Sequence, residues 1–108
     1  MAVNEDYLAF INDQLSAFGN YEEKRMFGGV GFFRDGIMFG LIGAGVLRFR
    51  VDETTQSEYE EQGMEPLRKD PKKKGMPYWQ VPEGVVEDRD ELKVWAEKAY
   101  KVAFTHKK

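Results

Sequence analysis

Between residues 25 and 42, apolar residues and glycines are interleaved in a pattern that suits tightly joined β-strands and no helix. The pair Asp35-Gly36 lies between two apolar runs, which is a strong short-range signal for a β-hairpin. The neighbouring connections are also short, and parallel strands would need long crossovers. The stretch therefore predicts an antiparallel meander, which offers backbone geometry and packing and little reactive chemistry.

The rest of the chain extends this meander into an α+β domain. The expected elements are a helix between an Asn4 cap and Gly19, strands over 21–27, 30–33, 37–42 and 46–51, a short helix over 54–62, an edge strand over 76–82 and a long helix after an Asp88 cap. Their order, α-β-β-β-β-α-β-α, predicts one domain over residues 1–108. We expect two layers, an antiparallel sheet of about five strands with flanking helices laid on one face.

Helical and strand periods also predict which residues are buried. In the first helix the apolar residues Leu8, Ile11, Leu15 and Phe18 recur at helical spacing, whereas Asp13 and Gln14 fall on the other side. Glycines predict local backbone features: Gly28-Gly29 breaks or bulges the first strand, and Gly40 makes room for an aromatic ring from a neighbouring strand.

Composition excludes several classes of function. The net charge of −3 argues against a dedicated DNA clamp, and the absence of cysteine excludes disulfides, thiolate zinc sites and a cysteine nucleophile. The N-terminal residues are polar and acidic, and no segment approaches the ~20 apolar residues of a membrane span, so a cytoplasmic protein is expected.

Catalytic, cofactor and metal sites are not expected. The glycine clusters at 28–31 and 40–45 superficially resemble phosphate loops, but strands follow both, where a phosphate loop needs a helix N-terminus. His106 is the one histidine and is expected to be frayed and solvated near the C-terminus. The carboxylates fall in helix first turns and on exposed faces, so an enzyme is not expected.

A basic run in the loop over 68–75 offers the alternative of direct nucleic-acid binding. Its cations are Arg68, Lys69, Lys72, Lys73 and Lys74. They could attract phosphates through counterion release, or they could belong to an exposed, mobile loop that keeps an edge strand soluble. The second interpretation is favoured because no aromatic residue within the loop could stack on bases. Arg48 and Arg50 could extend this basic surface or pair with Glu22 across the sheet.

Large apolar residues in the strands leave the oligomeric state open. Met26, Phe27, Phe32, Phe33, Met38 and Phe39 supply more apolar surface than one face of a small sheet obviously needs. They could share one core with the two amphipathic helices, or some could fill a dimer interface. A homodimer is slightly favoured.

The same residues carry a resemblance to a known family, the N-terminal domains of the TfoX/Sxy competence regulators. The signature residues are Arg25, Met26, Phe27, Gly28, Gly29, Gly31, Asp35, Gly36, Met38 and Phe39, followed by the segments 63–66, 78–82, 90–92 and 95–96. The resemblance implies a secretion-chaperone-like α+β fold that often dimerises. It also implies a regulatory role: helping a cyclic-AMP receptor-type activator to switch on DNA-uptake genes.

The resemblance brings no catalytic or ligand-binding residues to this chain. Full-length competence regulators carry a second, helical domain, whereas this chain ends at Lys108, so a stand-alone N-terminal domain is expected. The leading hypothesis is a non-enzymatic module that acts by protein–protein contact in transcriptional regulation, with no membrane partner.

Overall fold

A five-stranded antiparallel sheet, with its strands in sequence order, is the framework of the chain. The computed structural model describes residues 4–26, 29–43, 45–64 and 78–106. The strands are β1 (Glu22–Met26), β2 (Gly29–Arg34), β3 (Ile37–Gly43), β4 (Val46–Arg50) and β5 (Tyr78–Gln80). The helices are α1 (Glu5–Leu15), α2 (Gln56–Glu61), α3 (Glu83–Val86) and α4 (Arg89–Thr105). The predicted α+β class and element order are confirmed.

The single turn α3 lies between β5 and α4 and was not predicted. The main-chain amides of Val85 and Val86 both donate to the Pro82 carbonyl, at 3.0 Å each. Pro82 has φ −57°, the value that its ring imposes and that suits the entry to a helix. Four residues are too few to show a helical period in the sequence.

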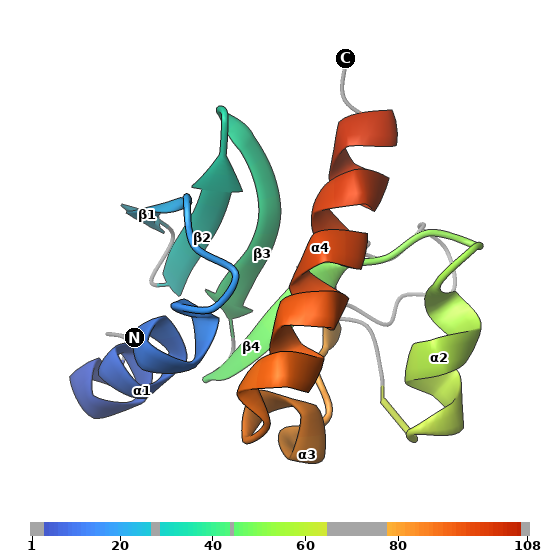
Figure 1. Ribbon diagram of the computed structural model, residues 1–108, viewed down its shortest axis with the longest axis horizontal. Coiled ribbons are helices and arrows are strands. Elements are labelled where there is room, and N and C mark those ends of the chain that lie inside the picture. Colours follow the sequence, from blue (N-terminus) through green and yellow to red (C-terminus); the bar gives the residue numbers. More distant parts are fainter. Residues whose placement is uncertain (1–3, 27–28, 44, 65–77, 107–108) are drawn as a thin grey trace.

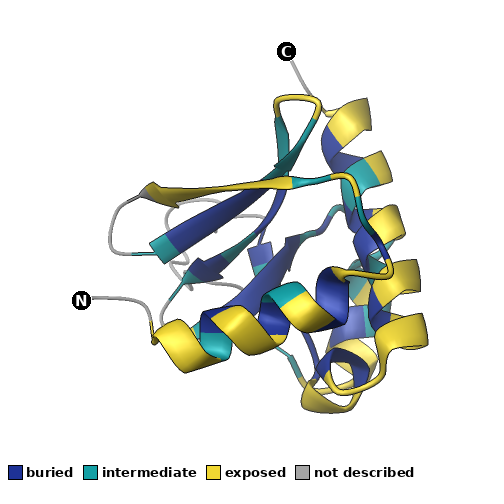
Figure 2. Cartoon of the chain, turned by 60° about the vertical axis from the view of Figure 1, so that its left-hand side comes forward, coloured by how far each residue is buried: buried dark blue, intermediate teal, exposed yellow. Residues whose placement is uncertain are grey.

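The helices α1 and α4 lie against the same face of the sheet, and α2 lies on the other side of α4 from α1 (Figure 1). Residues that are paired directly across strands share a sheet face. The helix-covered face therefore carries Val30, Phe32, Gly40, Ile42, Leu47 and Phe49. All six are buried, and Figure 2 shows that the buried sides of the strands and of the helices face one another.

Side-chain caps fix the starts of the two long helices as the sequence predicts. Asn4 Oδ1 accepts hydrogen bonds from the amides of Asp6 (2.9 Å) and Tyr7 (3.0 Å). Asp88 Oδ1 accepts from the amides of Asp90 (3.0 Å) and Glu91 (3.1 Å). Each cap satisfies two amides that have no partner inside the helix, so both boundaries are encoded locally.

The β2–β3 hairpin turns at Asp35 and Gly36, which have φ values of 53° and 78°. Positive φ at both central residues is typical of the type I′ turn, whose twist matches that of the flanking strands. The hairpin predicted from the Asp-Gly pair is confirmed.

A β-bulge in this hairpin directs Phe39 into the core. Phe32 pairs with Gly40 and Phe33 with Met38, so Phe39 is an extra residue on β3. Its ring is completely buried among other core rings. Two consecutive residues of β3 thus face the helices, which strict strand alternation forbids. The predicted break at Gly28-Gly29 lies partly outside the described residues.

Gln14 corrects the predicted polar face of α1. Its side chain is buried, Nε2 donates to the Val86 carbonyl at 3.0 Å, and Oε1 accepts from Arg89 Nε at 3.2 Å. The side chain therefore joins α1 to α3 and to the start of α4. A buried amide is tolerated there because both ends have partners.

Candidate functional site

Arg48, one of the two arginines predicted to extend a basic surface, lies almost entirely buried. Only 9% of its surface is exposed, and its Nε donates to the Gly43 carbonyl at 3.1 Å. Burial lowers the pKa of its guanidinium. Glu22 lies on β1, which β2 and β3 separate from β4, so the alternative Arg48–Glu22 pair does not form. The position of Arg48 favours a structural role over phosphate contact.

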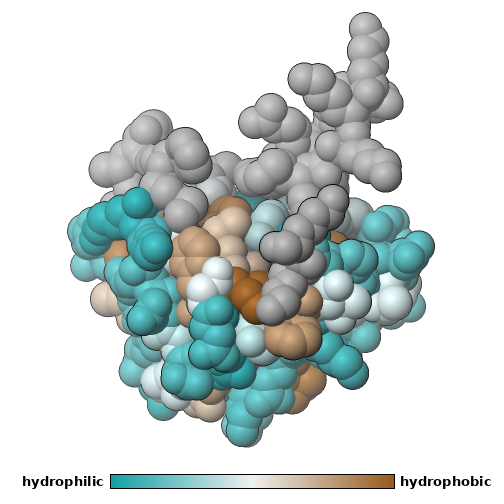
Figure 3. Space-filling view, turned by 90° about the horizontal axis from the view of Figure 1, so that it is seen from above, coloured by the Kyte–Doolittle hydropathy of each residue, from teal (hydrophilic) through white to brown (hydrophobic). Residues whose placement is uncertain are grey.

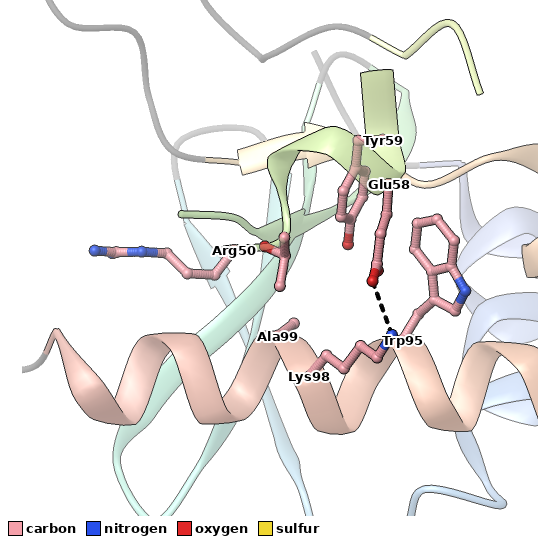
Figure 4. A pocket seen from close by; sticks show the side chains of 7 residues that line it. Arg50, Glu58, Tyr59, Trp95, Lys98 and Ala99 are labelled. Atoms are coloured by element: carbon pink, nitrogen blue, oxygen red, sulfur yellow. Dashed lines mark hydrogen bonds and ion pairs between the residues drawn. The ribbon is translucent and has the colours of Figure 1, made fainter. Parts of the chain in front are cut away.

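Arg50 is half-buried and lies on the same sheet face as Arg48. Its guanidinium carbon is 5.9 Å from the ring centroid of Tyr78, the residue paired with it on β5. Figure 4 shows the side chain pointing away from the hollow between α2 and α4. Its Nε is buried and has no hydrogen-bond partner among the described residues. Contact of Arg50 with a ligand stays a prediction.

The basic run of Arg68, Lys69, Lys72, Lys73 and Lys74 falls outside the described residues. Its proposed contact with nucleic acid or a partner, and the predicted mobility of the loop, stay predictions.

The described signature residues contribute to the scaffold. Arg25 forms a bidentate ion pair with Glu5 of α1, at 2.8 and 2.9 Å. Asp35 and Gly36 form the hairpin turn, and Phe39 lies in the core. The other described signature positions are Met26 in β1, Gly29 and Gly31 in β2 and Met38 in β3. Phe27 and Gly28 lie outside the described residues.

The apolar strand residues divide between the two faces of the sheet. Phe32 and Phe39 are completely buried under the helices. Phe33 and Met38 pair with each other on the opposite face and are half-buried, and the Lys24 ammonium lies 5.4 Å from the Phe33 ring centroid. The second face thus carries apolar groups beside a cation. A homodimer through it stays a prediction.

Three large hydrophobic residues among those described are substantially exposed: Phe10 at 40%, Val94 at 44% and Phe104 at 51%. The surface seen in Figure 3 is largely hydrophilic, with a small hydrophobic area near its centre. Isolated apolar residues of this kind are normal on a protein surface and do not by themselves indicate a contact site.

The hollow between α2 and α4 is filled. Tyr59 stacks edge-on against Trp95, with ring centroids 4.7 Å apart, and Lys98 Nζ pairs with Glu58 Oε2 at 3.0 Å (Figure 4). No water-sized space remains between the residues that line it. Burial raises the pKa of the Tyr59 hydroxyl far above its ordinary value. The residues that line this hollow pack against one another and stabilise the contact between α2 and α4.

A wider groove, about 450 Å³ in volume, runs between the start of α2 and the C-terminal half of α4. Asp52, one of its lining residues, contacts the end of α4: His106 Nε2 lies 2.9 Å from Asp52 Oδ2. The expected exposure of His106 is confirmed, since 44% of its side chain is exposed. Its contact with Asp52 and the hydrogen bond from its amide to the Val102 carbonyl contradict the expected fraying. The groove carries charges of both signs, with Asp52 and Glu58 opposite Lys98 and Lys101.

The contact between Asp52 and His106 predicts a pH-dependent contribution to stability. Partial burial raises the pKa of Asp52, but hydrogen bonds from Thr54 and His106 outweigh it and leave that pKa lowered. The stabilisation is then present above the unfolded-state value of about 4 and is lost as the pH falls through the lower folded-state value. We expect Asp52→Asn to cost about 1 kcal/mol in urea unfolding at pH 7 and much less near pH 3. An equal loss of stability at pH 7 and at pH 3 would contradict this dependence on the ionisation of Asp52.

A smaller groove lies between α1, α3 and the ends of β4 and β5. It has a volume of about 220 Å³. Its lining consists of Tyr7 and Phe10 from α1, Val46 from β4, Gln80 and Val81 from the end of β5, and Glu83, Val86 and Glu87 from α3 and its C-cap. Figure 1 shows α1 and α3 on either side of the start of β4. We name this the α1–α3 groove.

The sequence prediction missed the α1–α3 groove. Its lining residues are far apart in the chain, and half of them follow β5. One signal was present: Phe10 is a large aromatic residue of α1 that does not belong to the apolar stripe of Leu8, Ile11 and Leu15.

The described residues give no indication of a metal centre or a membrane span. Among them, no three His, Cys, Asp or Glu side chains lie together in a way that could hold a metal ion. No helix in the described ranges is long and apolar enough to cross a membrane.

Comparison with known families agrees with this scaffold. The family model of the TfoX N-terminal domain matches residues 13–103, which is most of the 108-residue chain. The chain belongs to the TfoX N-terminal domain family. This match confirms the resemblance carried by the β1–β3 signature, and the family is not a known enzyme family. No curated protein gives a significant match.

Proposed function

We propose that this TfoX N-terminal domain is a non-enzymatic, cytoplasmic regulatory module that acts through protein–protein contact in transcriptional regulation of the competence type. Family membership over residues 13–103 is the observation that carries the proposal. The resemblance described above implies a cyclic-AMP receptor-type activator as the partner and a homodimer as the working unit.

The arrangement of the ionisable side chains supports a binding role. Asp88 caps α4, while Glu5, Glu58 and Asp52 pair with Arg25, Lys98 and His106. These contacts use carboxylates and the histidine to join elements on the surface, where they are accessible to water. A general acid or base usually needs a sheltered position and a shifted pKa near the working pH.

Affinity capture tests the proposal. The full chain, immobilised at physiological salt, is expected to retain a transcription activator or an RNA polymerase component from a native lysate of its source cell, as identified by mass spectrometry. Recovery of the chain itself and no transcription protein, under several salt conditions, would contradict the proposal.

A DNA-binding measurement separates protein contact from direct nucleic-acid binding. We expect no shift of duplex DNA by the chain alone at low ionic strength. A shift that weakens steeply with salt, and that Lys72→Gln/Lys73→Gln/Lys74→Gln abolishes, would favour nucleic-acid binding by the basic run instead.

A further inference from the structure

The α1–α3 groove is preformed, because hydrogen bonds fix its walls to one another. The amide of Leu47 donates to the Tyr7 hydroxyl at 2.9 Å, which holds that ring against β4 just beyond the end of β5. Gln14 Nε2 donates to the Val86 carbonyl, so α1 and α3 are joined directly. Arg89 adds an ion pair to Asp13 of α1. A preformed groove binds a partner without the entropy cost of ordering it.

The groove is large enough for one bulky apolar side chain. A closed cavity of about 150 Å³ is enough to hold a benzene molecule, and this open groove measures about 220 Å³. Its floor is apolar, formed by Val46, Val81 and Val86. Phe10 stands at the rim with 40% of its surface exposed. An exposed aromatic residue beside an apolar hollow is typical of the anchor points of protein interfaces.

The charges at the rim are negative. Glu83 and Glu87 line the groove, both exposed, and no lysine or arginine is among its described lining residues. The pKa of the Tyr7 hydroxyl is raised, mainly by burial. The hydrogen bond from Leu47 lowers that pKa, and the negative charge of Glu83 raises it further. The positive charge of Arg48 lowers the pKa of the Tyr7 hydroxyl. Arg48 is buried, however, and its Nε donates to the Gly43 carbonyl.

We infer that the α1–α3 groove is the docking site for a partner-protein segment with one large apolar residue flanked by lysine or arginine. The apolar side chain enters the hollow beside Phe10, and the flanking cations pair with Glu83 and Glu87. This inference rests on the proposed function, since it names the surface through which the protein contact is made. The wider groove beside α2 carries charges of both signs, so its charge favours neither a basic nor an acidic partner segment.

Two blocked peptides of eleven residues test the charge preference. One has a single central tryptophan flanked by lysines, and the other has glutamate at every lysine position. We expect the lysine peptide to shift the backbone amide NMR signals of Tyr7, Phe10, Val81 and Val86. The glutamate peptide should bind at least tenfold more weakly at low salt. Equal binding of the two peptides, or shifts centred away from the groove, would overturn the inference.

Matched variants locate the site. Phe10→Ser is expected to weaken binding of the lysine peptide at least fivefold, whereas Val94→Ser removes an exposed apolar residue of α4 and should change it less than twofold. Glu83→Gln/Glu87→Gln should weaken it about fivefold, since each exposed ion pair contributes modestly. The control Glu61→Gln/Glu97→Gln removes the same charge elsewhere on the surface. Equal effects of groove and control variants would contradict a specific site.

The outcome separates this inference from the proposed function. If the wild-type chain and the Phe10→Ser variant both capture a transcription protein equally, protein contact stands and the docking site is wrong. If the lysine peptide binds in the groove and no transcription protein is captured, the docking site stands and the transcriptional role is wrong.

Discussion

Replacing Gly40 with alanine is expected to lower the free energy of unfolding by about 2 kcal/mol, because the core has no room for the added methyl group. A β-carbon at this position would lie 2.8 Å from Phe49 Cδ1 and 3.0 Å from the Arg48 carbonyl oxygen. The Phe49 ring is completely buried and packs 6.1 Å from the ring of Phe39, so it can move little. Urea unfolding followed by tryptophan fluorescence measures the loss.

The same substitution at Gly84 is the matched control. Gly84 lies in α3, and an added β-carbon there meets nothing within 4 Å. Gly84→Ala is expected to be neutral or to stabilise by about 0.5 kcal/mol, because alanine loses less backbone entropy than glycine. A double-mutant cycle with Phe49→Leu should show favourable coupling at Gly40, since the smaller side chain makes room for the methyl group. Purely additive effects would contradict the steric explanation.

Replacing Arg34 with methionine is expected to lower the free energy of unfolding by about 3 kcal/mol, because a single guanidinium joins the end of β2 to the turn that follows α1. Its Nη2 donates to the carbonyls of Phe18 (3.1 Å) and Gly19 (2.8 Å), and its Nε donates to that of Asn20 (3.1 Å). The guanidinium carbon also lies 3.7 Å from the Phe18 ring centroid.

Arg34→Lys distinguishes charge from geometry. An ammonium group keeps the charge, but it lacks the planar fork that serves three carbonyls and stacks on a ring. We expect lysine to recover less than half of the stability lost in the methionine variant. Full recovery would show that the positive charge alone stabilises this turn.

Much of the fold follows from local sequence signals. Asn4 and Asp88 fix the helix starts with their own side chains, and Asp35-Gly36 encodes the hairpin in two residues. Gly40 was also predictable, because a glycine inside an apolar strand usually marks a close approach. Each of these features depends on contacts within a few residues or on a single steric requirement.

The features that the sequence did not predict depend on distant contacts. Gln14 has an ordinary polar position on a helical wheel, and only Val86 and Arg89 explain its burial. The bulge at Phe39 requires the register between β2 and β3, which packing against α1 and α4 selects. The α1–α3 groove could not be predicted for the same reason, because its lining residues lie as far apart in the chain as Tyr7 and Glu87.

Transcript levels in the source cell test the central claim most directly. A strain that lacks the chain is complemented with the wild type, with Phe10→Ser or with Val94→Ser, at equal protein levels. We expect a defined set of transcripts, DNA-uptake genes among them, to change on deletion and to be restored by the wild type and Val94→Ser. Phe10→Ser should fail to restore them. An unchanged transcript profile on deletion would contradict a role in transcriptional regulation.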